Sequence, residues 1–91
     1  MADVRLRDEA LELMNELDAR DPDCADAIDD ILEDLAEDPL SVPHAFFAGG
    51  GRITTRALRG RDIEVGVAWV LEGTTVWIES VTTRNLPPRR R

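Results

Sequence analysis

Residues 60–81, GRDIEVGVAWVLEGTTVWIESV, read as two β-strands joined by a tight turn. Apolar residues recur at every second position, which is the period expected of a strand with one buried face. We predict the turn at Glu72-Gly73, because glycine accepts the positive φ that hairpin turns require. Trp69 then faces Val76, and one face of the hairpin is mostly apolar. The other pairs in this register are Leu71 with Thr74, Val67 with Ile78, and Val65 with Ser80.

Residues 52–58, RITTRAL, form a third strand, and the loop after it decides its register. A two-residue loop at Arg59 and Gly60 places Arg56 opposite Ile63, inside the apolar face. A three-residue loop through Arg61, with Gly60 left-handed, keeps Arg56 on the second face, and we predict this arrangement. Its pairs are Ala57 with Ile63, Thr55 with Val65, and Ile53 with Val67. The second face then carries Arg52, Thr54, Arg56, Leu58, Glu64, Gly66, Ala68, Val70, Thr75, Trp77, Glu79 and Val81, and we expect any chemistry there.

Two amphipathic helices are predicted in the first half of the chain, after a short strand at residues 4–7. Asp8 is the expected N-cap of the first helix. Asp21-Pro22 opens the second, and Asp38-Pro39 ends it, because the residue before proline is pushed out of helical geometry. Each helix has one apolar stripe. We therefore predict an α+β fold, with a helical hairpin on one face of a four-stranded, mainly antiparallel sheet, in the order strand, two helices, three strands.

The length of 91 residues is that of one domain. We predict a single domain over residues 1–85 and an extended or disordered arginine-rich tail over residues 86–91. One cysteine excludes an internal disulfide. No apolar run approaches the roughly 20 residues of a membrane span, and the start lacks the apolar segment of a signal peptide. A cytoplasmic protein without membrane contact is expected.

The net charge of −8 is distributed unevenly along the chain. Residues 1–43 carry fifteen Asp and Glu against three Arg, whereas residues 44–91 carry four against eight. The overall negative charge argues against long-range attraction to nucleic acid, although a local arginine face can still bind phosphate. The other use of such a pattern is pairing with a protein partner.

No metal or cofactor site is expected from the sequence. The acidic residues of the second helix lie mostly away from its apolar stripe, as on a solvated helix face. His44 has no second histidine or cysteine at ligand spacing, so zinc is not expected and His44 is assigned no role. Cys24 lies in the first turn of the second helix, where acidic neighbours oppose thiolate formation and no base is positioned.

Arginine and tryptophan side chains form the candidate binding site. Its members are Arg52, Arg56, Arg61, Trp77 and Arg84. Guanidinium groups beside an indole can bind and stack a nucleotide. Arg52, Arg56 and Trp77 share the second face, Arg61 lies in the preceding turn, and Arg84 ends the last strand. The alternative is that Arg56 only forms a cross-strand ion pair with Glu64.

The order of a strand, two helices, a loop and a three-stranded meander resembles the RelE/ParE toxin superfamily of bacterial toxin–antitoxin modules. Three stretches carry the resemblance: VRLRDEALELMNEL (4–17), ILEDLAEDPLS (31–41) and RITTRALRGRDIEVGVAWVLEGTTVWIESVTTRN (52–85). They are similar to the family's opening strand and helix, its second helix with a Leu-x-x-x-Pro end, and its arginine-containing meander. The resemblance spans residues 3–85 and implies a first strand that joins the meander and an antitoxin partner.

The resemblance also implies one of two targets. RelE-like members cut mRNA in the ribosome with basic residues and often a tyrosine near the C-terminus, whereas ParE-like members inhibit gyrase. Arg56 matches the family's arginine in the second strand, Arg61 lies near the one that opens the third, and Arg84 matches the one after the last strand. The chain departs from the pattern because it has no Tyr, no Lys and no final helix.

RNA cleavage through the 2′-hydroxyl needs a proton acceptor, and arginine cannot act as one at neutral pH. Glu64 or Glu79 would have to be the base, since no lysine, tyrosine or suitable histidine is present. The expected function is therefore that of a toxin-like component acting on translation or gyrase, with mRNA endoribonuclease activity left open. The alternatives are a non-catalytic protein-interaction domain, for which a homodimer is expected, and a small RNA-binding regulator.

Overall fold

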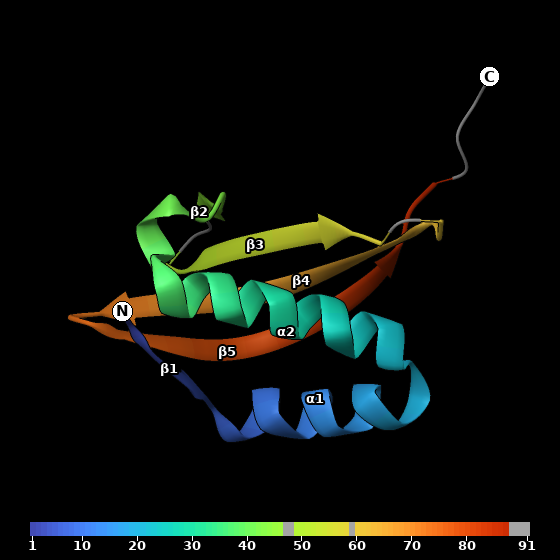
Figure 1. Ribbon diagram of the computed structural model, residues 1–91, viewed down its shortest axis with the longest axis horizontal. Helices are drawn as coiled ribbons and strands as arrows, with labels where there is room; N and C mark the ends of the chain where they lie inside the picture. The colour runs from blue at the N-terminus through green and yellow to red at the C-terminus, as the bar shows by residue number, and fades with distance from the viewer. Residues whose placement is uncertain (47–48, 59, 88–91) are drawn as a thin grey trace.

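The computed structural model describes residues 1–46, 49–58 and 60–87 as two helices on one face of a five-stranded mixed sheet (Figure 1). The elements are β1 Asp3–Leu6, α1 Asp8–Arg20, α2 Pro22–Glu37, the 3₁₀ helix η1 Pro39–Ser41, β2 Ala45–Phe46, β3 Arg52–Ala57, β4 Ile63–Glu72 and β5 Thr75–Asn85. The strand order is β1-β5-β4-β3-β2, and only the β1–β5 pair is parallel among the described strands. The predicted α+β class is confirmed. The prediction of four strands is wrong, because β2 adds a fifth. From Pro88 on, the predicted tail lies outside the described residues.

The starts of the helices follow from local sequence. Asp21 caps α2, since its Oδ1 accepts a hydrogen bond from the Cys24 backbone N–H at 3.4 Å, and Pro22 takes the first helical position. Contrary to the prediction, Asp8 is not the N-cap of α1 but its first helical residue. There its negative charge interacts favourably with the helix dipole. Within the described residues, no helix is long and apolar enough to cross a membrane.

The core fills the layer between the helices and the sheet. From the helices and the loop after them it takes Ala10, Leu17, Cys24, Ala25, Ile28, Ile31, Leu35 and Val42, and from the sheet Val65, Val67, Trp69, Val76, Ile78 and Val81. Trp69 is the largest side chain that is fully buried. The apolar stripe predicted for the second helix thus meets the apolar face predicted for the hairpin.

The β4–β5 hairpin turns one residue later than predicted. Gly73-Thr74 forms the loop, and Glu72 pairs with Thr75. Gly73 has a φ of 62° at the first loop position, where type II′ turns take glycine, so the second position accepts threonine. The predicted Glu72-Gly73 turn is therefore wrong. Pairs near the turn shift by two residues, which leaves the same side chains on the buried face.

A β-bulge reverses the faces of the second half of β5. The register shifts between Ala68 and Trp69 of β4, and Glu79 is the extra residue of β5. Beyond it Val81 faces the core, although it was predicted on the second face, and Arg84 faces away from the core. Because Glu79 is the inserted residue, its side chain stays in solvent and the side chain of Val81 is buried.

β3 lies one residue out of the predicted register. Arg56 pairs with Val65, and Arg52 pairs with Trp69, because the turn between β3 and β4 closes where the Leu58 N–H donates to the Ile63 carbonyl. The side chains that face the helix layer are Arg52, Thr54 and Arg56, and those that face away are Ile53, Thr55 and Ala57. The sheet face opposite the helices, termed the open face below, carries Ile53, Thr55, Ala57, Glu64, Gly66, Ala68, Val70, Thr75, Trp77, Ser80, Thr82 and Arg84.

Thr54 and Arg56 are tolerated on the helix side of β3 because each finds a hydrogen-bond partner there. The buried Thr54 hydroxyl accepts a hydrogen bond from Trp69 Nε1 and donates one to the Pro43 carbonyl, both at 3.0 Å. Arg56 reaches Asp34 of α2, with 2.9 Å between Nη2 and Oδ2. The prediction had treated an arginine on this face as unsatisfied, which is why it chose the wrong register.

Thr54→Val should lower the free energy of unfolding by about 1–3 kcal/mol, because it leaves the Trp69 indole and the Pro43 carbonyl without their partner. Urea denaturation measures the change. Thr55→Val, on the open face, is the matched control and should change stability by less than about 0.5 kcal/mol. A larger loss for Thr55→Val would favour the register predicted from sequence.

Candidate functional site

The five residues predicted to form one binding site lie in three places. Arg52 and Arg56 are on the helix side of β3, Trp77 and Arg84 are on the open face, and Arg61 is in the β3–β4 loop. The one-residue shift of β3 separates its arginines from Trp77. The structure therefore does not bring these residues together as a single site.

Three of the predicted arginines are held by carboxylates of the same chain. The pairs are Arg56–Asp34 at 2.9 Å, Arg61–Asp21 at 2.8 Å and Arg84–Glu64 at 2.9 Å. The alternative prediction of an Arg56–Glu64 pair is wrong, because the shifted register of β3 puts Arg56 opposite Val65, on the other face from Glu64. Exposed ion pairs of this kind add at most about 1 kcal/mol each. They do reduce the positive charge that a phosphate would meet.

The Arg61–Asp21 pair fastens the β3–β4 loop to the start of α2. Nη1 and Nη2 of Arg61 each donate to one carboxylate oxygen of Asp21 at 2.8 Å. This hydrogen bonding, with the cap bond from Cys24, holds the pKa of Asp21 well below its usual range, and it raises the pKa of Arg61. Burial raises the pKa of the Cys24 thiol, which keeps it protonated at neutral pH and unsuited to nucleophilic attack.

The open face has an apolar strip between charged pairs. Its half-buried members are Ile53, Ala68, Val70 and Trp77. The guanidinium carbon of Arg7 lies 4.1 Å from the centroid of the Trp77 ring, and Arg7 also pairs with Glu79 at 3.4 Å. An aromatic residue within an apolar strip, bordered by charged groups, is typical of a protein-binding surface.

The two carboxylates predicted as possible bases are both engaged by arginine. Glu64 pairs with Arg84, and Glu79 pairs with Arg7. In each pair a guanidinium lies against the carboxylate, where a substrate hydroxyl would have to approach a general base. The arrangement therefore does not favour general-base catalysis at either residue.

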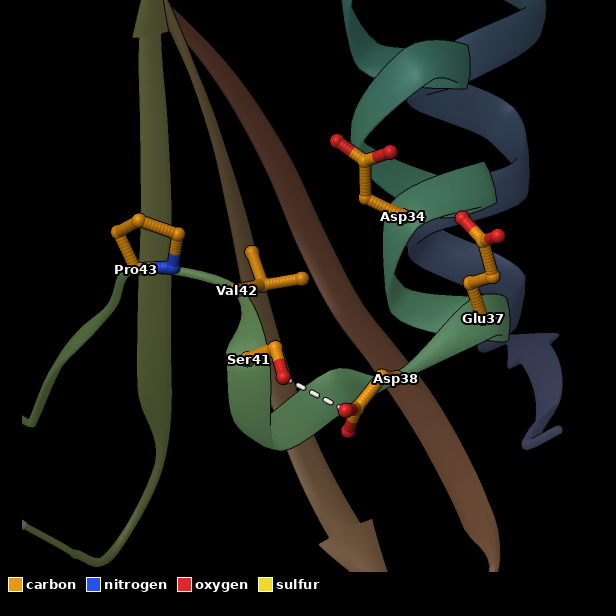
Figure 2. Close-up of a pocket in the computed structure, with 6 residues that line it drawn as sticks. All are labelled: Asp34, Glu37, Asp38, Ser41, Val42 and Pro43. Atoms are coloured by element: carbon orange, nitrogen blue, oxygen red, sulfur yellow. Dashed lines mark hydrogen bonds between the residues drawn. The ribbon is translucent and has the colours of Figure 1, made fainter.

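An acidic groove of about 360 Å³ lies between the end of α2 and the segment that leads to β2 (Figure 2). It is lined by Asp34, Glu37, Asp38, Ser41, Val42 and Pro43. The Ser41 hydroxyl donates to Asp38 at 2.6 Å, and Asp34 is shared with Arg56. In the part of the chain that the structure describes, no group of three or more His, Cys, Asp or Glu side chains is placed to hold a metal ion.

Arg52 lies among aromatic side chains, and His44, which was assigned no role from the sequence, packs against the same rings. The guanidinium carbon of Arg52 lies 5.1 Å from the ring centroid of Phe46 and 5.3 Å from that of Trp69. The His44 ring meets the same two rings edge-on, at 5.2 and 5.5 Å between centroids. These four residues are termed the Arg52 cluster. The alternation of His44 and Phe46 just before the glycine run was the available signal for the short β2 strand that positions them.

Arg61→Ala should lower the free energy of unfolding at neutral pH. The difference in free energy of unfolding between Arg61→Ala and the parent should become smaller as the pH falls below about 4. The folded-state pKa of Asp21 lies below its unfolded value of about 3.9. The stabilisation is therefore present above that value and is lost as the pH falls toward the folded-state pKa. Urea denaturation at several pH values measures it.

Asp21→Asn is the matched control, because it keeps a capping oxygen for Cys24 and removes the charge. In an Asp21→Asn background, Arg61→Ala should have little effect at any pH. An equal loss of stability in both backgrounds would show that Arg61 acts without Asp21.

Comparison with known proteins returns no match: no family model, curated protein or solved structure matches the chain. The likeness to RelE/ParE toxins stays an expectation from the quoted stretches of sequence. What the chain does has to be inferred from its own side chains and their arrangement.

Proposed function

We propose that this chain is the toxin-like component of a bacterial toxin–antitoxin module and acts by binding a protein target, as gyrase inhibitors do, and not by cutting mRNA. The antitoxin neutralises it by covering the surface that binds the target. That surface is the open face. A non-toxic interaction domain would use the same face and differs only in what its partner does.

The observation that carries the proposal is the engagement of the candidate arginines. Arg56, Arg61 and Arg84 are each bound to a carboxylate, at separate places on the molecule. A ribonuclease needs cationic groups that converge on one phosphate, together with a base. The described residues offer neither the convergence nor an unengaged carboxylate among the predicted bases, so binding is favoured over cleavage.

The open face supplies the matching surface. Trp77, Val70 and Ala68 lie on adjacent strands and are half-buried, so a partner would complete their burial. The charges beside them are already paired, Arg7 with Glu79 and Arg84 with Glu64. A partner can therefore dock without burying an unpaired charge, which is the costliest term in protein association.

The distribution of charge supports a choice between the two faces. The helical half of the chain carries most of the carboxylates, whereas in the part of residues 44–87 that the structure describes four arginines balance four carboxylates. Carboxylate-rich helices repel an acidic target and remain in solvent. The sheet side is thus the more favourable one for contact.

Induction in a bacterial host without any partner tests the proposal. The parent chain should arrest growth and leave messages uncleaved, and Arg56→Ala with Arg61→Ala should arrest growth equally, since neither side chain lies on the open face. Val70→Glu, which puts a charge into the apolar strip, should weaken target binding at least about tenfold and release growth.

Leu11→Glu is the matched control, since it makes the same type of change at an exposed apolar position of α1. It should leave the arrest intact, and circular dichroism checks that each variant is folded. Cleaved messages, with escape of the double arginine variant, would support a ribonuclease instead. Normal growth of the host, with the parent protein folded, would contradict a toxic activity in that host.

A further inference from the structure

The open face is the side of the sheet that both helices leave uncovered (Figure 1). At its centre runs β4, the middle strand of five, and Ala68 lies near the midpoint of that strand. Gly66, on the same face, has no room for a side chain, because a Cβ there would lie 2.7 Å from Thr82 Oγ1. Val70 and Trp77 add half-buried apolar area beside this centre. A broad surface of this kind fits another sheet better than a small ligand, which needs a concave site.

The size of the open face sets the kind of interface that it can form. β4 is ten residues long, which at ~3.3 Å per residue makes the face ~33 Å long. Five strands ~4.8 Å apart make it at most ~24 Å wide, and β1 and β2 cover only part of the length. The area is therefore no larger than the ~800 Å² that each partner buries in a standard interface. An interface of this size is weak and reversible.

The distribution of charge favours a second copy of the chain as the occupant. Residues 1–43, which hold both helices, carry fifteen carboxylates against three arginines, whereas the two kinds of charge balance in the described part of residues 44–87. Two copies that meet face to face keep both acidic helix layers on the outside. Two sheets, packed ~10 Å apart, then separate these layers, and that distance alone exceeds the Debye length of ~8 Å at physiological salt.

The ion pairs at the border of the open face also favour a second copy. Arg7 pairs with Glu79 at 3.4 Å, and Arg84 pairs with Glu64 at 2.9 Å, so these charges are neutralised within the chain. A strongly acidic or strongly basic partner would meet no complementary charge there. A second copy brings a face that is equally balanced, and neither copy has to bury an unpaired charge.

We propose that two copies of this chain associate through their open faces, sheet against sheet, as a weak and reversible homodimer. The apolar strip of each copy covers that of the other. The dimer thus shields the surface to which the proposed function assigns target binding, and a target competes with the second copy for it. This regulatory role rests on the proposed function, whereas the dimer itself does not.

Sedimentation velocity, from micromolar to millimolar protein, tests for the dimer. The mass should rise with concentration from that of one chain to that of two. Added sodium chloride should strengthen the association, because it screens the repulsion between two chains that each carry a net charge of −8.

Val70→Glu puts a carboxylate into the apolar strip of both copies and should weaken the dimer at least about tenfold. Leu11→Glu, the same type of change at an exposed position of α1, is the matched control and should sediment as the parent does. Circular dichroism verifies that each variant folds.

Cross-linking gives a second measurement that introduces no charge into the face. A two-fold axis through the centre of the face brings Ala68 of one copy next to Ala68 of the other. The short thiol cross-linker bismaleimidoethane should therefore join two chains of Ala68→Cys and leave Leu11→Cys as single chains. The parent is the blank, because its one cysteine, Cys24, is buried.

Three results would overturn the assignment. The first is the mass of a single chain at every concentration, and a monomeric parent that still arrests growth would contradict the dimer alone. The second is a dimer that Leu11→Glu disrupts and Val70→Glu does not, which would place the contact on the helices. The third is an association that salt weakens, which would identify binding of arginines to the acidic helices. A dimer with the expected responses, in a chain that leaves its host growing normally, would support this assignment and contradict the proposed function.

Discussion

The hydroxyl of Thr54 is the interaction on which the sheet depends. It receives the indole N–H of Trp69 from β4 and donates to the carbonyl of Pro43, so it joins three segments inside the core. Trp69 is fully buried, and its N–H has to be satisfied there. This requirement selects the register of β3 and, with it, the face on which Arg52 and Arg56 lie.

A second constraint comes from the extra residue in β5. Glu79 interrupts the alternation, so the strand buries Ile78 before the bulge and Val81 after it. The same interruption brings Arg84 opposite Glu64 and allows Glu79 to reach Arg7, whose guanidinium covers Trp77. The bulge thus arranges the charged pairs that border the apolar strip of the open face.

Local patterns in the sequence predict the elements well and their pairing poorly. Three predicted features depend only on neighbouring residues, and each appears in the structure. They are the alternation of apolar residues in the strands, the helix start at Asp21-Pro22 and the apolar stripes of the two helices. The register of β3 depends on distant partners, Trp69 and Pro43 for Thr54 and, 22 residues away along the chain, Asp34 for Arg56. Glu79 is not marked by a glycine or any other turn residue. The candidate site failed for the same reason, because which arginines share a face follows from register and bulge.

Parallel pairing of β1 with β5 joins two strands that are far apart in the sequence. Residues Asp3 to Leu6 pair with Thr75 to Ile78, across a loop of about seventy residues whose closure has a large entropic cost. β1 therefore finds its neighbour only after β5 has been made, when all the other described elements are already present. Until then Val4 and Leu6 lack the core contacts that they make in the folded protein, and the negative charge of the helices that follow them disfavours association between unfinished chains.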